Sequence, residues 1–205
     1  GVEEDGATFR ENAAKKALAA CRYCDVPAFA DDSGLEVEAL EGRPGIFSAR
    51  YAPTDKERIA KLLEELKDKE NRRARFVCAI AIAINGEVIE TFEGEVKGSI
   101  VDAPRGADGF GYDPIFLPDG YDQTFGEMPQ ELKNRISHRA AAFKMALNFV
   151  EDEMSVLDDD FDHISIAGQW NTVNIFSPAT LMIRRKVCGS PCFTVCRSAA
   201  AGTFI

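Results

Sequence analysis

The sequence predicts a domain in which helices pack against a β-sheet, and three observations support this prediction. Two segments open with the Thr-x-x-Glu pattern of a helix start. Residues 74–84 form an apolar run with strand character, and the Asn85-Gly86 pair that follows is a strong hairpin signal. A chain of 205 residues is long enough to bury a sizeable core around these elements.

The first expected helix covers residues 9–22. Thr8 precedes it as an N-cap, and Glu11 follows three residues later, so each side chain can satisfy a free backbone donor of the other residue. Small side chains then recur at helical spacing, at Ala13, Ala17, Ala20 and Cys21. We expect this small-residue face to pack closely on a sheet.

Two short strands are expected next, at residues 27–30 and 35–40. Between them lies Asp31-Asp32-Ser33-Gly34, whose residue types are favoured in turns. Two adjacent carboxylates at the end of a strand can also hold a hard cation through oxygen ligands. The residues alone leave both interpretations open, a solvated turn or a cation site.

The middle of the chain supplies a helix and a hairpin. The second Thr-x-x-Glu pattern begins at Thr54 and opens a helix with an apolar stripe that ends near Leu66. Large and small side chains alternate along residues 74–84, which favours a central strand covered on both faces. The turn at Asn85-Gly86 returns residues 87–97 as an antiparallel partner.

The last third combines a glycine-rich loop with a basic helix start. Residues 106–114 interleave glycines with aromatic rings, which suits close backbone approach to a ligand and stacking on a flat base. A tight turn with Phe110 in the core is the alternative. A short strand follows at 115–116. Ser137 can cap a final helix that runs to about residue 151. The cations around this cap could bind an anion at the helix start, or they could simply form a charged surface.

Composition excludes several classes of protein. With 24 Lys and Arg against 34 Asp and Glu, the net charge of −10 excludes a broad grip on a nucleic-acid polymer, while a small phosphorylated ligand is compatible with it. No apolar run suits a membrane span and the start lacks a signal peptide, so we expect a soluble, cytoplasmic protein. The Cys21–Cys24 pair lacks a second pair for zinc, and Cys188, Cys192 and Cys196 do not predict a metal site.

Four blocks taken together resemble the inosine triphosphate pyrophosphatase family, also called non-canonical purine nucleoside triphosphate pyrophosphatases. They are TFRENAAKKA, ADDSGLEVEALEGRPGIFSARYA, GADGFGYDPIF and TFGEMPQELKNRISHRAAA. The resemblance spans residues 1–151. It implies an α/β fold with a long mixed β-sheet flanked by helices, two lobes with a central nucleotide cleft, and a homodimer.

The resemblance also implies Mg²⁺-dependent hydrolysis of ITP, dITP and XTP to the monophosphate and pyrophosphate. Asp32 would be the general base, and the metal carboxylates would be Glu3, Asp31 and Asp32. The triphosphate would contact Lys16, Ser33 and Lys133. The base pocket would comprise Phe110, Gly111, Tyr112 and Asp113, with His138 and Arg139 recognising the 6-keto oxygen.

Two further expectations concern the ends of the chain. Family members begin with a strand and a phosphate-binding loop, and we expect the domain at residues 1–151 to lack both. Residues 152–205 match no motif, so we expect an unassigned, poorly ordered tail. Two alternatives to the hydrolase stay open, a catalytically inactive fragment that at most binds nucleotide or dimerises, and a related pyrophosphatase for pyrimidine or modified nucleotides.

Overall fold

The computed structural model describes residues 2–156, 179–182 and 194–197. Helices and strands alternate along the first part of the chain, with short 3₁₀ turns between them. The helices are α1 (Phe9–Cys24), α2 (Asp55–Glu65), α3 (Gln130–Ile136) and α4 (His138–Val156). The strands are β1 (Ala28–Val37), β2 (Arg73–Ile84), β3 (Glu87–Ile100), β4 (Phe116–Pro118), β5 (Ala179–Met182) and β6 (Thr194–Arg197). The 3₁₀ turns are η1 (Glu38–Leu40), η2 (Gly45–Arg50) and η3 (Asp113–Ile115).

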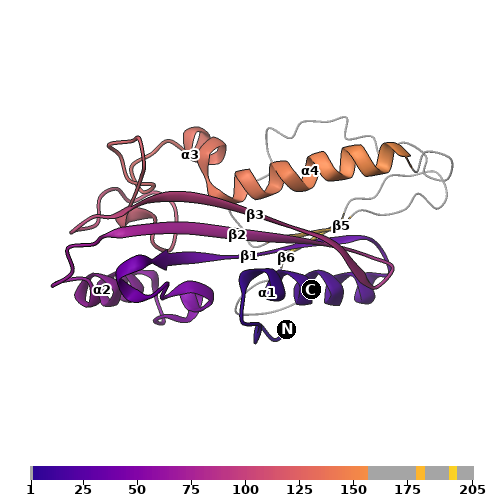
Figure 1. The fold of residues 1–205 in the computed structure, drawn as a ribbon, viewed down its shortest axis with the longest axis horizontal. Coiled ribbons are helices and arrows are strands. Elements are labelled where there is room, and N and C mark those ends of the chain that lie inside the picture. The colour runs from indigo at the N-terminus through magenta and orange to yellow at the C-terminus, as the bar shows by residue number, and fades with distance from the viewer. Residues whose placement is uncertain (1, 157–178, 183–193, 198–205) are drawn as a thin grey trace.

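The strands form one sheet in the order β4-β3-β2-β1-β5-β6. Figure 1 shows α1 and α2 on one side of this sheet and α3 and α4 on the other. The expected α/β class with flanking helices is therefore confirmed. One detail differs from the expected mixed sheet: every pairing among the described strands is antiparallel. The β2–β3 pair is a hairpin, whose two strands necessarily run in opposite directions.

Strand β2 is covered on both faces, as the alternation of its side chains predicts. Its small side chains, together with Val77, pack with α1 residues such as Ala13 and Ala17 on what we call the α1 face of the sheet. Its larger side chains, with Cys78, pack with α4 residues such as Ala142 on the α4 face. Alanines against α1 permit the close packing expected from the small-residue face of that helix.

The capping and turn signals also correspond to the structure. Thr8 accepts a hydrogen bond from the Glu11 backbone, and α2 begins with a complete capping box at Thr54. The Asn85-Gly86 turn has positive φ at both residues, 53° and 79°, as a type I′ hairpin requires. Helix α4 starts after Ser137, whose hydroxyl accepts from the Ala140 backbone at 3.2 Å.

The expected break between two strands at residues 31–34 was wrong, and of the two interpretations left open for these residues the solvated turn does not hold. Residues 31–34 are the middle of β1, which runs unbroken from Ala28 to Val37 and pairs residue by residue with β2. Gly34 allows η2 to pack closely on this strand, since a Cβ there would lie 2.5 Å from the Gly45 carbonyl oxygen and the Ser48 hydroxyl. Tertiary pairing thus overrides the local turn preference of these residues.

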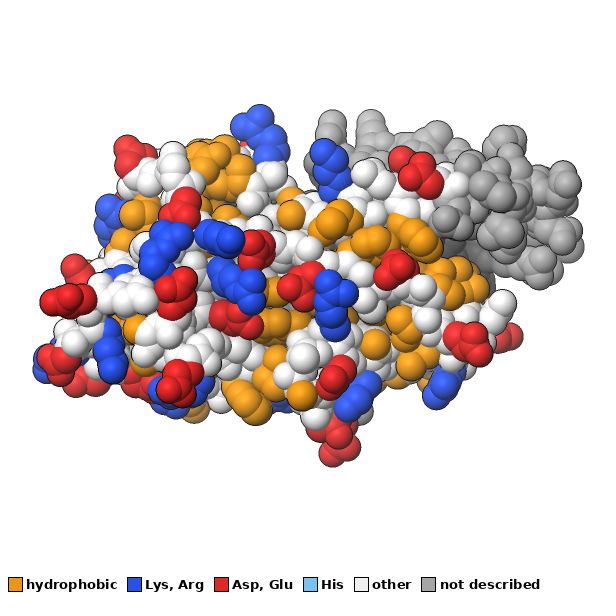
Figure 2. Space-filling view, viewed as in Figure 1, with side chains coloured by type: hydrophobic (Ala, Val, Ile, Leu, Met, Phe, Trp, Pro, Cys, Tyr) orange, Lys and Arg blue, Asp and Glu red, His pale blue; other side chains and the backbone are white. Residues whose placement is uncertain are grey.

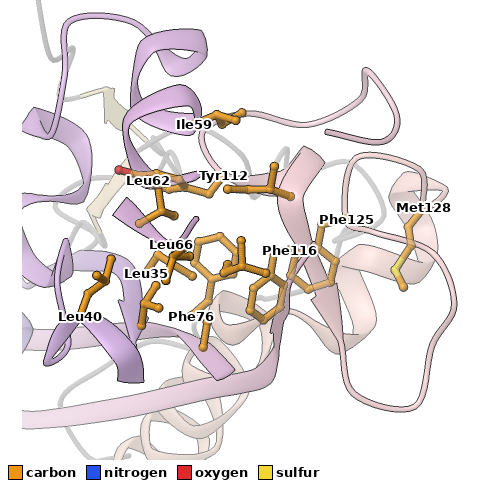
Figure 3. Packing of buried hydrophobic residues seen from close by; sticks show 14 residues of the cluster. Leu35, Leu40, Ile59, Leu62, Leu66, Phe76, Tyr112, Phe116, Phe125 and Met128 are labelled. Carbon is orange, nitrogen blue, oxygen red and sulfur yellow. The ribbon is translucent and has the colours of Figure 1, made fainter. Parts of the chain in front are cut away.

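An aromatic core forms at the end of the sheet near α3. Phe76 of β2 lies 4.7 Å from Phe116 between ring centroids, and Phe116 lies 5.3 Å from Phe125. These side chains pack in one cluster with Leu35, Leu66 and Tyr112, as Figure 3 shows. The His138 ring stacks on the Phe76 ring, with 4.9 Å between the ring centroids and an interplanar angle of 10°. This core therefore anchors the start of α4.

The remaining expectations concern the surface, the cysteines and the tail. Acidic and basic side chains are interspersed over the face shown in Figure 2. Within the part of the chain that the structure describes, Cys21 and Cys78 are free thiols. Cys188 and Cys192 lie outside the described residues, and Cys196 falls in β6. No helix in the described part of the chain is both long and apolar enough for a membrane span. Helix α4 continues to Val156, past the boundary expected at residue 151.

Candidate active site

The side-chain alternation of β1 divides the candidate residues between the two faces of the sheet. Successive side chains of a strand point to opposite faces. Phe29 packs with the residues of the α4 face, whereas Ala28 and Ala30 pack with those of the α1 face. In the same alternation Asp31 contacts α4 and Asp32 contacts α1. The two adjacent carboxylates therefore do not point into one common site.

On the α4 face, Arg139 ties the start of α4 to β1. Its Nε lies 3.2 Å from Asp31 Oδ2, and its Nη2 donates to Ser33 Oγ at 2.7 Å. Both Arg139 and Asp31 side chains are only 18% exposed. The guanidinium carbon also lies 5.4 Å from the centroid of the Phe110 ring. One side chain thus joins three segments that are far apart in the sequence.

Phe110 stands on a loop held by a buried ion pair. Asp113 accepts hydrogen bonds from the Phe110 backbone at 2.7 Å and from Lys133 Nζ. Lys133 and Asp113 are 3% and 4% exposed, and Lys133 Nζ lies 5.1 Å from the Phe110 ring centroid. Burial raises the pKa of Asp113, although Lys133 opposes that shift. Gly109 is required here, because it has φ +85° and its Cβ would lie 2.3 Å from Asp113 Oδ2.

The loop leaves the Phe110 ring accessible. Phe110 is 42% exposed, so the alternative in which it sits in the core does not hold. Tyr112 is different: it is 3% exposed, belongs to the aromatic core, and donates from its hydroxyl to the Ser48 carbonyl at 3.0 Å. Gly111 donates its N–H to Asp55 at 2.7 Å. Phe110 is therefore partly exposed to solvent, whereas the buried Tyr112 anchors the loop.

On the α1 face, Lys16 lies between two carboxylates. Its Nζ is 2.8 Å from Asp32 Oδ1 and 3.1 Å from Glu4 Oε1. Glu4 also pairs with Arg50, whose Nη1 lies 3.6 Å from Glu4 Oε2. Asn12 donates from Nδ2 to Asp32 Oδ2 at 3.2 Å. We call Glu4, Asn12, Lys16, Asp32 and Arg50 the α1-face cluster.

Burial governs the electrostatics of this cluster. It raises the pKa of Asp32, and the hydrogen bonds and charge from Lys16 and Asn12 counteract that rise only in part. Burial also lowers the pKa of Lys16, but attraction from Asp32 and Glu4 outweighs it, so the Lys16 pKa is raised overall. Lys16 therefore stays a cation, next to a carboxyl group that takes up a proton more readily than an exposed aspartate does.

The structure differs from the expected metal set in two ways. Glu3 is exposed, and its neighbour Glu4 is the residue that pairs with Lys16 and Arg50. Asp31 is on the opposite face, paired with Arg139. Within the described residues no three His, Cys, Asp or Glu side chains group closely enough to hold a metal ion. On the α1 face, Glu4 and Asp32 both approach the Lys16 ammonium.

Comparison with known proteins identifies the family. The model of the Ham1 family matches residues 1–149. The chain belongs to the Ham1 family. It is 53% identical over 142 residues to the dITP/XTP pyrophosphatase of Deinococcus deserti, covering 68% of each chain. It is 49% identical over 155 residues to the dITP/XTP pyrophosphatase of Bacillus subtilis, covering 73% of this chain and 78% of that one.

A solved Ham1 structure shares the fold. The Ham1 protein of Staphylococcus aureus superposes with a TM-score of 0.71 at 46% identity, covering 75% of this chain and 81% of that chain. At this identity the likeness extends beyond the general architecture to the family itself. The residues matched by the Ham1 model include both faces of β1, the Phe110 loop and the start of α4.

His138 occupies a distinctive place in this Ham1 chain. It is 7% exposed, it stacks on Phe76, and its Nδ1 has no hydrogen-bond partner among the described residues. Burial lowers the His138 pKa well below its usual value, and the nearby charges of Arg139 and Lys133 lower it further. Burial therefore favours the neutral imidazole, whose Nδ1 is an unused polar atom next to the Phe76 ring.

The residues that sequence reasoning missed are Glu4, Asn12, Arg50 and Asp55. A signal existed for Asn12, which lies four residues before Lys16 and therefore on the same stretch of helix surface. Glu4, and not its neighbour Glu3, contacts Lys16 because of the path by which the chain approaches α1. Two adjacent glutamates give no local signal that distinguishes which one makes this contact. Asp55 and Arg50 contact segments far away in the sequence.

His138 generates a pH prediction. The folded chain holds it neutral, whereas the unfolded chain binds a proton below a pKa of about 6.5, so acid favours unfolding. The free energy of unfolding should fall by about 1.4 kcal/mol for each pH unit below that value on account of this one group. His138→Asn should lose that contribution. Urea unfolding of both proteins at pH 7 and pH 5 measures the difference, and equal pH dependence in the two proteins would contradict a buried neutral His138.

Proposed function

We propose that this chain hydrolyses non-canonical purine nucleoside triphosphates, namely ITP, dITP and XTP, to the monophosphate and pyrophosphate. The observation that carries the proposal is the position of Arg139. It contacts Asp31 and Ser33 on β1 and lies 5.4 Å from the Phe110 ring, so the polar segment of β1, the glycine-rich loop and the start of α4 converge. Names of Ham1 relatives that act on dITP and XTP support the same substrate class.

The α4 face is suited to a 6-keto purine. The exposed Phe110 ring offers a stacking surface for a flat base, with two cations next to it. Arg139 can only donate hydrogen bonds, and we assign the neutral His138 the Nδ1–H tautomer, in which the unpartnered Nδ1 is a donor. Hypoxanthine and xanthine present an oxygen acceptor at position 6, whereas adenine presents an amino donor. A group of donors therefore selects against adenine.

The α1-face cluster is suited to the phosphates. Lys16 supplies a fixed positive charge beside Asp32, and Arg50 adds a second cation near Glu4. We assign Asp32 as the general base that accepts a proton from the water attacking the α-phosphorus. A base works best when its pKa approaches the working pH, and burial shifts the pKa of Asp32 in that direction.

The donor set of the α1 face also fits a hard divalent cation. Glu4 and Asp32 present carboxylate oxygens to a single positive charge, the ammonium of Lys16. We propose that these two residues hold Mg²⁺, in place of the expected set of Glu3, Asp31 and Asp32. Bound Mg²⁺ would neutralise charge on the phosphate oxygens. Lys133, expected to contact the triphosphate, is more suited to holding the base loop through Asp113.

Three further parts of the proposal come from the resemblance and composition. We infer a homodimer and a nucleotide cleft between two lobes, as the family resemblance implies. We also infer a cytoplasmic location, which the thiols of Cys21 and Cys78 support because reducing compartments keep thiols unpaired. The inactive alternative is not favoured, since the acidic, basic and aromatic side chains that the reaction needs are present in two organised groups.

Substrate preference provides the direct test of the activity. With Mg²⁺, the chain should release pyrophosphate from ITP with a kcat/KM about 100-fold above that for ATP, because the donors near Phe110 oppose the adenine amino group. Separate assays for pyrophosphate and inorganic phosphate identify the bond that is cleaved. Equal turnover of ITP and ATP, or release of phosphate instead of pyrophosphate, would contradict the proposal.

Asp31 and Asp32 provide matched variants on the two faces. Asp32→Asn should lower kcat for ITP by about 100-fold or more, because it removes the base. Asp31→Asn should act mainly on KM, raising it by about tenfold, since Asp31 orients Arg139 on the base side. Steady-state kinetics of the two variants measures the split. An Asp32→Asn protein with full kcat would exclude Asp32 as the base.

A further inference from the structure

Asn12 is the most completely buried polar side chain of the α1-face cluster. It lies in the first turns of α1 and is 1% exposed. Its amide makes two hydrogen bonds: Oδ1 accepts from the Gly6 backbone at 2.8 Å, and Nδ2 donates to Asp32 Oδ2 at 3.2 Å. A buried amide with an acceptor and a donor bond of this kind has one defined orientation, because Gly6 N–H can only donate and a carboxylate accepts.

These two bonds join the segments that carry both acidic side chains of the cluster. Gly6 lies two residues after Glu4, and a Cβ at Gly6 would lie 2.6 Å from Asn12 Oδ1, so the chain approaches the amide as closely as glycine allows. At the other end of the amide is Asp32. Asn12 therefore connects the Glu4 segment to β1 through a single side chain.

The carboxylate of Asp32 is held at both oxygens. Lys16 takes Oδ1 at 2.8 Å and Asn12 takes Oδ2 at 3.2 Å. Lys16 lies four residues after Asn12 and also contacts Glu4 at 3.1 Å. With two partners on separate oxygens the carboxyl plane cannot rotate freely. Lys16 neutralises the group, whereas Asn12 contributes direction without adding charge.

We propose that Asn12 is a positioning residue for hydrolysis, which orients the Asp32 carboxylate and holds the Glu4 segment beside it. This inference rests on the proposed function, because it assigns Asp32 to the chemical step. We assign Asn12 no contact with the nucleotide, since its amide bonds go to Gly6 and Asp32. Its loss should therefore lower kcat and leave substrate binding nearly unchanged.

Asn12→Asp is the sharpest variant, and the chain offers a matched control. The aspartate keeps the shape and still accepts from Gly6, but it turns an acceptor oxygen toward Asp32. Asn71 makes the same pair of bonds elsewhere: its Oδ1 accepts from the Arg73 backbone at 2.9 Å and its Nδ2 donates to Glu38 at 3.1 Å. Asn71 is exposed, so Asn71→Asp repeats the chemical change outside the site.

We expect Asn12→Asp to lower kcat for ITP by about 100-fold with KM within about threefold, and Asn71→Asp to change neither by more than about twofold. A second readout needs no activity. In Asn12→Ala, which also lacks the contact to Asp32, amide hydrogen exchange at Gly6 should accelerate by about tenfold or more, whereas Asn71→Ala should leave it unchanged. If Asn12→Asp does not fold, Asn12→Ser replaces it with the same expected loss of kcat.

A folded Asn12→Asp protein with kcat within about threefold of the unsubstituted chain would overturn the inference while the proposed function stands. Unchanged exchange at Gly6 in Asn12→Ala would overturn the link to the Glu4 segment. An unsubstituted chain that does not cleave ITP would contradict the proposed function and the inference with it. These outcomes separate the failure of the two claims.

Discussion

Strand β1 passes between two helical layers with Asp31 directed toward α4 and Asp32 toward α1. This alternation is a property of any extended strand, and here it places the two carboxylates against different helices. Cations that neutralise a carboxylate come from a different helix on each face, Lys16 from α1 and Arg139 from α4. The continuity of β1 through residue 34 is therefore the constraint on which the rest of the site depends.

The continuity of β1 also sets the positions of the two groups relative to one another. Ser33 accepts from Arg139 on the α4 face, one residue beyond Asp32 on the α1 face. Strand β2 pairs with one edge of β1 along its whole length, whereas in the described residues β5 pairs with the other edge only at Ala28, away from Asp31 and Asp32. We infer that a nucleotide lies across this part of β1, with its phosphates toward α1 and its base toward Phe110.

Local signals predicted most of the scaffold. The Thr8 cap, the Asn85-Gly86 turn and the alternation along β2 each depend on residues close in sequence, and the structure confirms them. The polar segment of β1 shows where local reasoning fails. Asp, Ser and Gly favour turns by themselves, but pairing with β2 holds the segment extended.

The candidate site was predictable where its residues stand in local sequence motifs, and not where long-range contacts decide. Arg139, Phe110 and Asp113 stand in recognisable blocks, and the structure places them in contact. Long-range contacts decided the rest. Glu4 instead of Glu3 meets Lys16, and Asn12 meets Asp32, because α1 packs on β1 with this face. Adjacency in sequence suggested that Asp31 and Asp32 act together, and the period of the strand separates them.

A crystal structure with Mg²⁺ and a non-hydrolysable α,β-imido analogue of ITP tests the division of the site most directly. The account predicts phosphates beside Lys16 and Asp32, Mg²⁺ on Glu4 and Asp32, and the base stacked on Phe110 with its 6-keto oxygen toward His138 and Arg139. Phosphates bound to Arg139 and Asp31 on the α4 face, or a base remote from Phe110, would contradict it.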